Sequence, residues 1–166
     1  MNDKELHSKV HTTMYNLIKE KGIASPVDVL IAVGVLSKTD YERWRNGEID
    51  YLERVCKINL RKLSKINHEI RAFANKNDLK PSWTLYKRWG KNKKGNKGSK
   101  GSTHKGDTAK LRFSKSGDKN IEKQYATHYI SQRTVADAKE RRRMKDTQLD
   151  ISPHLSDESG EQTQQE

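Results

Sequence analysis

Positively charged side chains are concentrated between Lys87 and Lys123, and they give the chain its clearest chemical character. This stretch holds 13 Lys and Arg residues against 3 acidic residues, a net charge of +10 within a whole-chain charge of +12. Ammonium and guanidinium groups bind phosphate oxygens through charge and hydrogen bonds, without reading any base. Such a density of cations predicts a polyanionic partner, and nucleic acid fits it best.

The middle of this stretch, residues 91 to 110, consists almost entirely of Lys, Gly, Asn, Ser and Thr. Such a segment cannot bury enough apolar surface to offset the entropy of ordering it, so we expect a mobile loop in the free protein. Loops of this length are unusual inside a compact domain and are commonly functional or disordered. We predict an electrostatic arm that reaches phosphates through six lysines: Lys91, Lys93, Lys94, Lys97, Lys100 and Lys105.

The two segments that flank this loop alternate between apolar and polar residues. SWTLYKRWG (82–90) and LRFSK (111–115) fit the two strands of a β-hairpin, with Trp83, Leu85 and Trp89 on the inner face of the first. A solvated strand face explains the pattern equally well, and a register shift of one residue would exchange the two faces. The side chains predicted to contact nucleic acid here are Tyr86, as a stacking platform, and Lys87, Arg88, Arg112, Ser114 and Lys115.

The function that these residues favour is nucleic-acid binding with low sequence specificity, and they leave the choice between DNA and RNA open. The main alternative is a protein-interaction or accessory module whose basic loop binds an acidic protein partner. A third possibility is a phosphodiester-directed enzyme, if folding brings His128 near Lys115 and Arg112. A histidine packed against the sheet is a simpler explanation, so the sequence favours a binding protein over an enzyme.

Three further patterns have an ordinary structural explanation beside a functional one. The segment from Ser114 to Asp118 would bind an anion at a helix N-terminus, or Asp118 would simply cap that helix. GVLSKTDYERWRNGE (34–48) partly matches a helix-turn-helix, but its turn is one residue too long and its acidic residues would face phosphates. His7 and His11 have the spacing of metal ligands on a helix; no third ligand is evident, so no metal or cofactor is expected.

Helical periodicity and capping signals predict the elements that position these side chains. Gly22 ends the first helix, Ser25 and Pro26 begin the second, and Asn59 interrupts the apolar stripe of the fourth. The predicted helices cover about 3–21, 26–36, 39–45, 50–77 and 119–145. The predicted fold is α+β and mostly helical, with N-terminal helices, a β-hairpin that carries a long basic mobile loop, and a C-terminal helix.

Length and composition limit what the chain can be. With 166 residues, of which 31% are hydrophobic, we predict one domain with a small core at 1–145 and a disordered acidic tail at 146–166. This tail either competes for the basic loop or serves only solubility. Cys56 alone supports neither a disulfide nor a thiolate cluster. No secretory signal and no apolar run of roughly 20 residues is evident, so we expect a cytoplasmic protein without membrane contact.

Three motifs resemble an uncharacterised family of small bacterial proteins. They are GVLSKTDYERWRNGEIDYLERV at 34–55, LKPSWTLYKRWG at 79–90 and LRFSKSGDKNIEKQYATHYIS at 111–131. The resemblance covers roughly residues 25 to 131 except for the basic loop, which is longer and richer in lysine here. The family brings no known activity, fold or catalytic residues with it. The resemblance therefore implies only that the hairpin segments and the last helix form one unit with the helical half.

Overall fold

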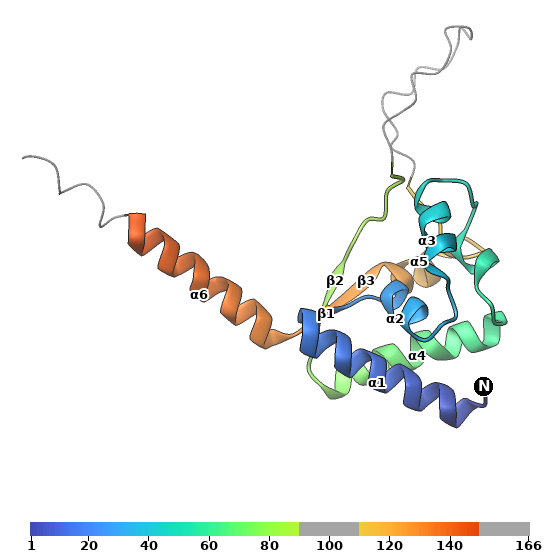
Figure 1. The fold of residues 1–166 in the computed structure, drawn as a ribbon, viewed down its shortest axis with the longest axis horizontal. Helices are drawn as coiled ribbons and strands as arrows, with labels where there is room; N and C mark the ends of the chain where they lie inside the picture. The colour runs from blue at the N-terminus through green and yellow to red at the C-terminus, as the bar shows by residue number, and fades with distance from the viewer. Residues whose placement is uncertain (90–109, 150–166) are drawn as a thin grey trace, which may run out of the picture. The chain divides into compact units, whose positions relative to one another are not determined.

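The computed structural model describes residues 1–89 and 110–149, apart from the side chains of residues 138 and 145–149 (Figure 1). The lysines predicted between 91 and 105, and most of the predicted tail, lie outside these ranges. The chain divides into two compact units, Met1–Gln132 and Arg133–Glu166. The first unit combines helices with a three-stranded antiparallel sheet, which confirms the predicted α+β, mostly helical fold.

Helix α1 (Asp3–Lys21) has the bounds that its sequence predicts. Asn2 caps it by accepting a hydrogen bond from the Glu5 N–H at 2.8 Å. Gly22 ends it in the left-handed conformation, with a φ of 70°, and donates its N–H to the helix. The helix presents one apolar face to the core, made of Leu6, Val10, Met14 and Leu17.

Serine caps begin the next two helices. The Ser25 hydroxyl accepts the Asp28 N–H at the start of α2 (Pro26–Ala32), as predicted. This helix is shorter than expected, because the chain turns at Gly34 (φ 84°) and returns two N–H groups to the Leu30 carbonyl. Helix α3 (Lys38–Arg45) then begins at the Ser37 cap and leads into a third left-handed glycine, Gly47.

The predicted helix at 50–77 is in fact two elements, a short 3₁₀ helix η1 (Leu52–Val55) and helix α4 (Leu60–Lys76). Asn59, predicted as an interruption of the apolar stripe, is the N-cap of α4 and accepts the Lys62 N–H at 2.9 Å. At the start of η1 the backbone is used differently: the Leu52 and Glu53 N–H groups donate to the carbonyls of residues 112 and 113.

The sheet has the order β1 (Ile23–Ala24), β3 (Thr127–Ile130), β2 (Lys80–Trp83), with antiparallel neighbours. Its central strand interrupts the helix predicted at 119–145, which becomes α5 (Lys119–Ala126) and α6 (Gln132–Leu149). The reason lies in the sequence THYI, whose β-branched and aromatic side chains favour a strand. Pairing on both sides, with Ile23 and Ala24 and with residues 80–83, then satisfies its backbone.

The two segments predicted as hairpin strands do meet in antiparallel orientation, but over a short distance. Lys87 pairs with Lys110, and the Leu111 N–H donates to the Tyr86 carbonyl at 2.9 Å. Residues 80–83 pair with β3 instead, so the regular strand β2 belongs to the sheet and not to the hairpin. The two segments on either side of residues 90–109 are therefore joined at a paired base, formed by Lys87 and Lys110.

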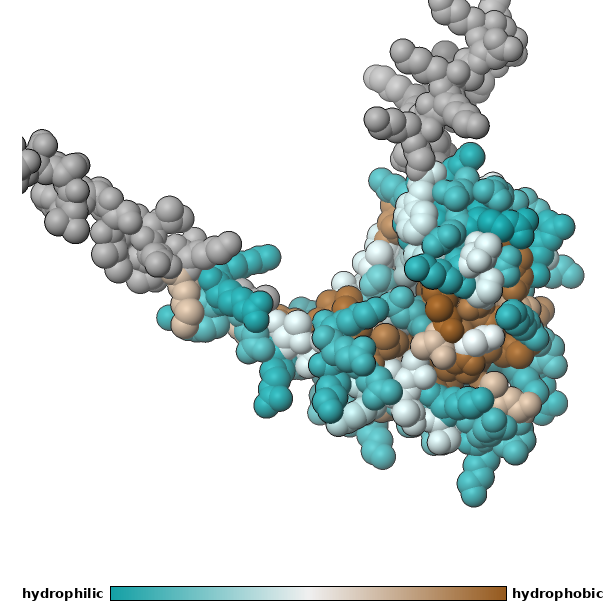
Figure 2. Space-filling view, in the orientation of Figure 1, coloured by the Kyte–Doolittle hydropathy of each residue, from teal (hydrophilic) through white to brown (hydrophobic). Residues whose placement is uncertain are grey.

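An aromatic cluster fills the core beneath this base. Phe113 stacks on Tyr125 with ring centroids 5.5 Å apart, and Trp44 contacts both Phe113 and Tyr86. Helix α1 packs against α4 below the cluster and completes the core. Figure 2 shows that hydrophobic residues also reach the surface near α2 and α4, within a mainly hydrophilic face.

In the second unit the described element is α6, apart from its first residue. Its sequence is rich in charged residues and carries no continuous apolar stripe. None of the helices in the described ranges is long and apolar enough to cross a bilayer.

Candidate nucleic-acid interface

The side chains of residues 83–87 alternate, but with the predicted inner face turned outward and Tyr86 turned inward, whereas Arg88 is exposed like Trp89. Trp83, Leu85 and Trp89 are exposed, with relative accessibilities of 56%, 39% and 44%, whereas Tyr86 is 7% exposed. The predicted stacking role of Tyr86 on the outer face is therefore wrong. Its ring packs among the core aromatic residues, and its hydroxyl finds a partner in His128, so burial leaves no polar group unsatisfied.

An open groove of about 540 Å³ lies beside the exposed Trp83. Leu85 and Trp83 form part of its wall, and the core residue Phe113 contributes to its lining. Three exposed lysines also line it, from the hairpin base and from α5: Lys110, Lys119 and Lys123. The groove thus combines an apolar surface with a rim of positive charge, a pairing that suits a flat ring attached to a phosphate.

One acidic residue, Glu122, also lines this groove, but backbone and hydroxyl donors occupy its carboxylate. The carboxylate accepts the Phe113 and Ser114 N–H groups, at 3.0 and 2.7 Å, and the Ser114 hydroxyl at 2.6 Å. Ser114 is consequently 1% exposed and does not lie on the outer face where it was predicted. The Glu122 side chain fixes the wall of the groove through these donors.

The two predicted arginines are exposed, yet their guanidinium groups already bind backbone carbonyls. Arg88 donates from Nε to the Asn46 carbonyl at 2.8 Å, at the C-terminal end of α3. Gly47 makes this contact possible, because a Cβ there would lie 2.6 Å from the Arg88 Nε. Arg112 donates to the carbonyls of Ser114 and Lys115. Both arginines hold the loops around the groove in place and keep their positive charge at the surface.

The remaining predicted contacts, Lys87 and Lys115, are exposed but lie apart in the fold. Lys87 is at the hairpin base, where it pairs with Lys110. Lys115 lines a different hollow of about 550 Å³ together with Ile121. Its backbone N–H donates to Glu53 at 2.9 Å, and Asp118 caps α5, so the predicted capping of this helix is confirmed.

Sequence reasoning missed Arg45, which lies in an aromatic cage at the end of α3. Its guanidinium carbon is 4.6 Å from the ring centroid of Trp89 and 5.2 Å from that of Tyr86. The backbone N–H of Trp89 also donates to the Arg45 carbonyl at 2.6 Å. Arg45 thereby fixes the last described residue before the basic segment. Its place after Trp44 in a helical pattern gave no sign of this cage.

His128 hydrogen-bonds to Tyr86, with the hydroxyl oxygen 2.8 Å from Nε2. Burial raises the pKa of Tyr86 to about 12, so the hydroxyl stays protonated and can donate to the ring. The arrangement is that of a half-buried histidine on strand β3, packed against the ring of Tyr86. It matches the simpler explanation that the sequence left open for this residue.

We expect the protein to lose stability as the pH falls, because His128 takes up a proton more readily in the unfolded chain. Burial lowers the pKa of His128, opposed by the negative charge of Asp28, so the unfolded chain takes up the proton first. The stability that the neutral His128 side chain contributes is complete above the ordinary histidine pKa of about 6.5. It is lost as the pH falls from there toward the pKa of His128 in the folded protein. Urea unfolding at about pH 7.5 and about pH 5.5 measures it. His128→Gln should lose less stability over this interval, and an equal loss would contradict the assignment.

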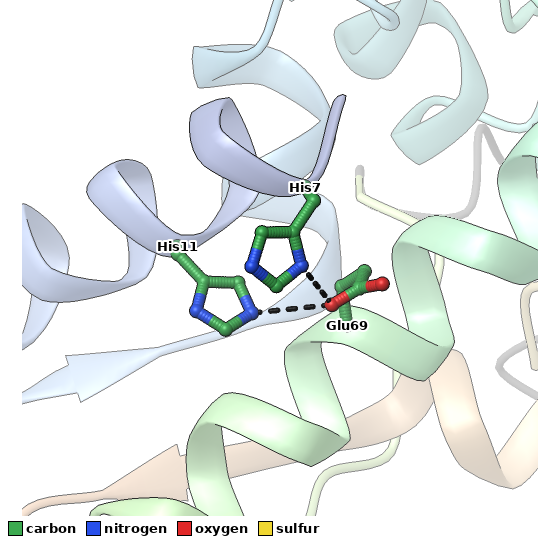
Figure 3. Close-up of side chains that lie close together, drawn as sticks. All are labelled: His7, His11 and Glu69. Carbon is green, nitrogen blue, oxygen red and sulfur yellow. Dashed lines mark hydrogen bonds and ion pairs between the residues drawn. The ribbon is translucent and has the colours of Figure 1, made fainter. Parts of the chain in front are cut away.

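His7 and His11 do have a third potential metal ligand nearby, the Glu69 carboxylate of α4 (Figure 3). The sequence showed the histidine pair, but Glu69 lies 58 residues beyond His11, so no local spacing could connect them.

No match emerges from comparison with known proteins. Neither a family model, nor a curated protein, nor a solved structure is similar to this chain. Function is therefore inferred from the geometry of its own residues.

Proposed function

We propose that the protein binds nucleic acid with low sequence specificity, through the groove beside Trp83 and the lysine-rich segment that begins after Trp89. The observation that carries this proposal is the exposed indole of Trp83 next to a rim of lysines. Trp83, with a relative accessibility of 56%, leaves apolar surface in water, and burying that surface against a partner is favourable. A nucleobase covers it with a flat apolar face, and its phosphates complement the lysines.

The same residues explain why little base specificity is expected. Stacking on an indole is available to every base, because each base has an aromatic face. Lysine is a point charge with rotatable donors, and it suits phosphates better than the fixed pattern of a base edge. Lys110, Lys119 and Lys123 line the same groove as Trp83, so they can meet the phosphates of a nucleotide whose base stacks on it. This arrangement favours unpaired over duplex nucleic acid, since a paired base does not expose its face.

Fluorescence anisotropy with labelled oligonucleotides tests the proposal. Single- and double-stranded DNA and RNA of one length are titrated with the full chain across a salt series. Polyelectrolyte binding gives a steep linear fall of log affinity with log salt, and we expect the single strands to bind more tightly. Absence of binding at low salt, despite the charge of +12, would overturn the proposal and direct attention to an acidic protein partner.

Trp83→Ala should weaken the binding of single-stranded oligonucleotides by about tenfold, because base stacking on an aromatic side chain contributes about 1–3 kcal/mol. The salt dependence should stay the same, since no charge changes. Tyr15→Ala is the matched control, because Tyr15 is an equally exposed aromatic residue (57%) on α1. Similar affinity for the Trp83→Ala and Tyr15→Ala variants would show that bases do not stack on Trp83.

A further inference from the structure

Helices α1 and α4 bring two imidazoles and a carboxylate together at their contact (Figure 3). His7 Nδ1 lies 2.6 Å from Glu69 Oε2, and His11 Nε2 lies 3.2 Å from the same oxygen. The two rings are one helical turn apart on α1, with centroids separated by 4.0 Å. One ligand atom from each of the three residues lies within 4.8 Å of the others.

The packing of the two helices positions this cluster. Leu6 and Val10, each one residue before a histidine, are fully buried in the core that α1 shares with α4. The His11 ring also meets Phe73 edge-on at 5.4 Å, which fixes its orientation. The three side chains are therefore held close together before any ligand arrives, so little conformational entropy remains to be lost on binding.

We propose that His7, His11 and Glu69 form a binding site for a divalent transition ion of the zinc class. Two imidazole nitrogens and one carboxylate oxygen are the donor set that such ions prefer, whereas Mg²⁺ and Ca²⁺ prefer oxygen ligands alone. Ligand atoms around a tetrahedral zinc ion lie about 3.3 Å apart, given bond lengths of about 2.0–2.2 Å. The distance from His11 to Glu69 already matches this value, and a small rotation of the Glu69 carboxylate brings His7 to it.

The site is open on one side, which leaves a coordination position for water. The His7 side chain is 52% exposed, His11 is 25% exposed and Glu69 is 13% exposed. An ion can therefore enter without any rearrangement of the helices. Positive side chains, Arg61 and Lys65 among them, line a hollow with Glu69, so we expect a dissociation constant of about micromolar, not nanomolar.

The Glu69 Oε2 atom already lies within hydrogen-bonding distance of both imidazoles. A bound ion would take the place of these hydrogen bonds. It would join residues 58 and 62 positions apart in the chain, so binding should stabilise the packing of α1 on α4.

Calorimetric titration of the metal-free full chain with ZnCl₂, together with thermal unfolding, tests this site. We expect one Zn²⁺ per chain with micromolar affinity, a rise in Tm with ZnCl₂ and no such rise with MgCl₂. His7→Ala and Glu69→Gln should each weaken binding by about tenfold or more and abolish the rise in Tm. His68→Ala is the matched control, because His68 is an exposed histidine of α4 next to Glu69, and it should stay within about twofold.

Two results would overturn the proposal. Absence of saturable Zn²⁺ binding would leave a hydrogen-bonded cluster only. Binding that survives in both His7→Ala and Glu69→Gln would assign the ion to other histidines of the chain. Because His7 is half exposed and Glu69→Gln preserves side-chain shape, both variants should fold, and circular dichroism of each without metal checks this.

Discussion

Replacing the six lysines between 91 and 105 by glutamine should reduce the salt dependence of nucleic-acid binding more than any change within the folded domain. Each phosphate neutralised on a single strand contributes about −0.7 to the slope of log affinity against log salt. If all six lysines contact phosphates, the slope should become shallower by up to about 4. At low salt the affinity should fall by about two to three orders of magnitude, because released counterions supply much of the binding free energy.

The matched control removes the same charge from elsewhere on the surface. Six exposed lysines of the described domain are replaced by glutamine in a second variant: Lys4, Lys9, Lys19, Lys21, Lys57 and Lys76. In both variants the net charge falls from +12 to +6, because six positive charges are lost. If the lysines between 91 and 105 contact phosphates directly, the slope of log affinity against log salt should change strongly in the first variant and little in the second.

Deleting residues 91–109, with a short Gly-Ser link in their place, gives an independent test. Lys87 pairs with Lys110, so a short link can close the paired base, and the domain should stay folded. The slope should become shallower as in the glutamine variant, with the Trp83 contribution retained. Equal slopes for the deletion and the full chain would show that the basic segment is not the electrostatic arm. Equal effects of the two six-lysine variants would show that net charge alone matters.

Local signals predicted some helix ends, whereas the ends of α2, α4 and α5 differ from the prediction. Asn, Ser and Gly act on backbone groups within three or four residues of themselves, so their effect can be seen in the sequence. Gly22, Ser25 and Asp118 all stand where the caps were predicted. The strand at Thr127–Ile130 was missed for the opposite reason, because its partners lie far away in the chain, before α2 and after α4.

The candidate site was only partly predictable, for the same physical reason. Alternation along 83–89 shows that two faces exist, but tertiary contacts decide which face is buried. Tyr86 is buried because His128 and the aromatic core receive it, and both are distant in sequence. Trp83 is left outside, where the lysines of α5 reach it. The basic composition predicts a polyanionic partner, and this stays a prediction, whereas the choice of Trp83 as the stacking residue required the fold.

Trp44→Ala should destabilise the domain by about 3–5 kcal/mol, the usual cost of removing a large aromatic side chain from a core. Trp44 is fully buried and contacts the rings of Tyr86 and Phe113. Its indole N–H donates to the Arg112 carbonyl at 2.9 Å, so it also holds the segment that forms the groove wall. Urea unfolding followed by circular dichroism measures the loss.

Trp44→Phe separates packing from hydrogen bonding, and it remains measurable if the alanine variant does not fold. Most of the apolar contact persists, but the hydrogen bond from the indole N–H to the Arg112 carbonyl is lost. That carbonyl keeps the longer hydrogen bond from the Leu52 N–H, at 3.2 Å. We expect a loss of about 1–2 kcal/mol, as for a buried hydrogen bond whose partner remains.

Trp83→Ala is the counterpart of these two variants, because it changes the same residue type on the opposite side of the groove wall. It should alter the free energy of unfolding by less than about 1 kcal/mol, as expected for an exposed side chain, while it weakens binding. Trp44→Phe should do the reverse, with lower stability and nearly unchanged affinity at temperatures where it is folded. If Trp83→Ala instead destabilised the domain as much as Trp44→Ala, its indole would be part of the core and not a surface for a ligand. The two tryptophans together thus test whether the exposed face of the segment 83–89 serves binding, and whether the aromatic core around its buried Tyr86 serves folding.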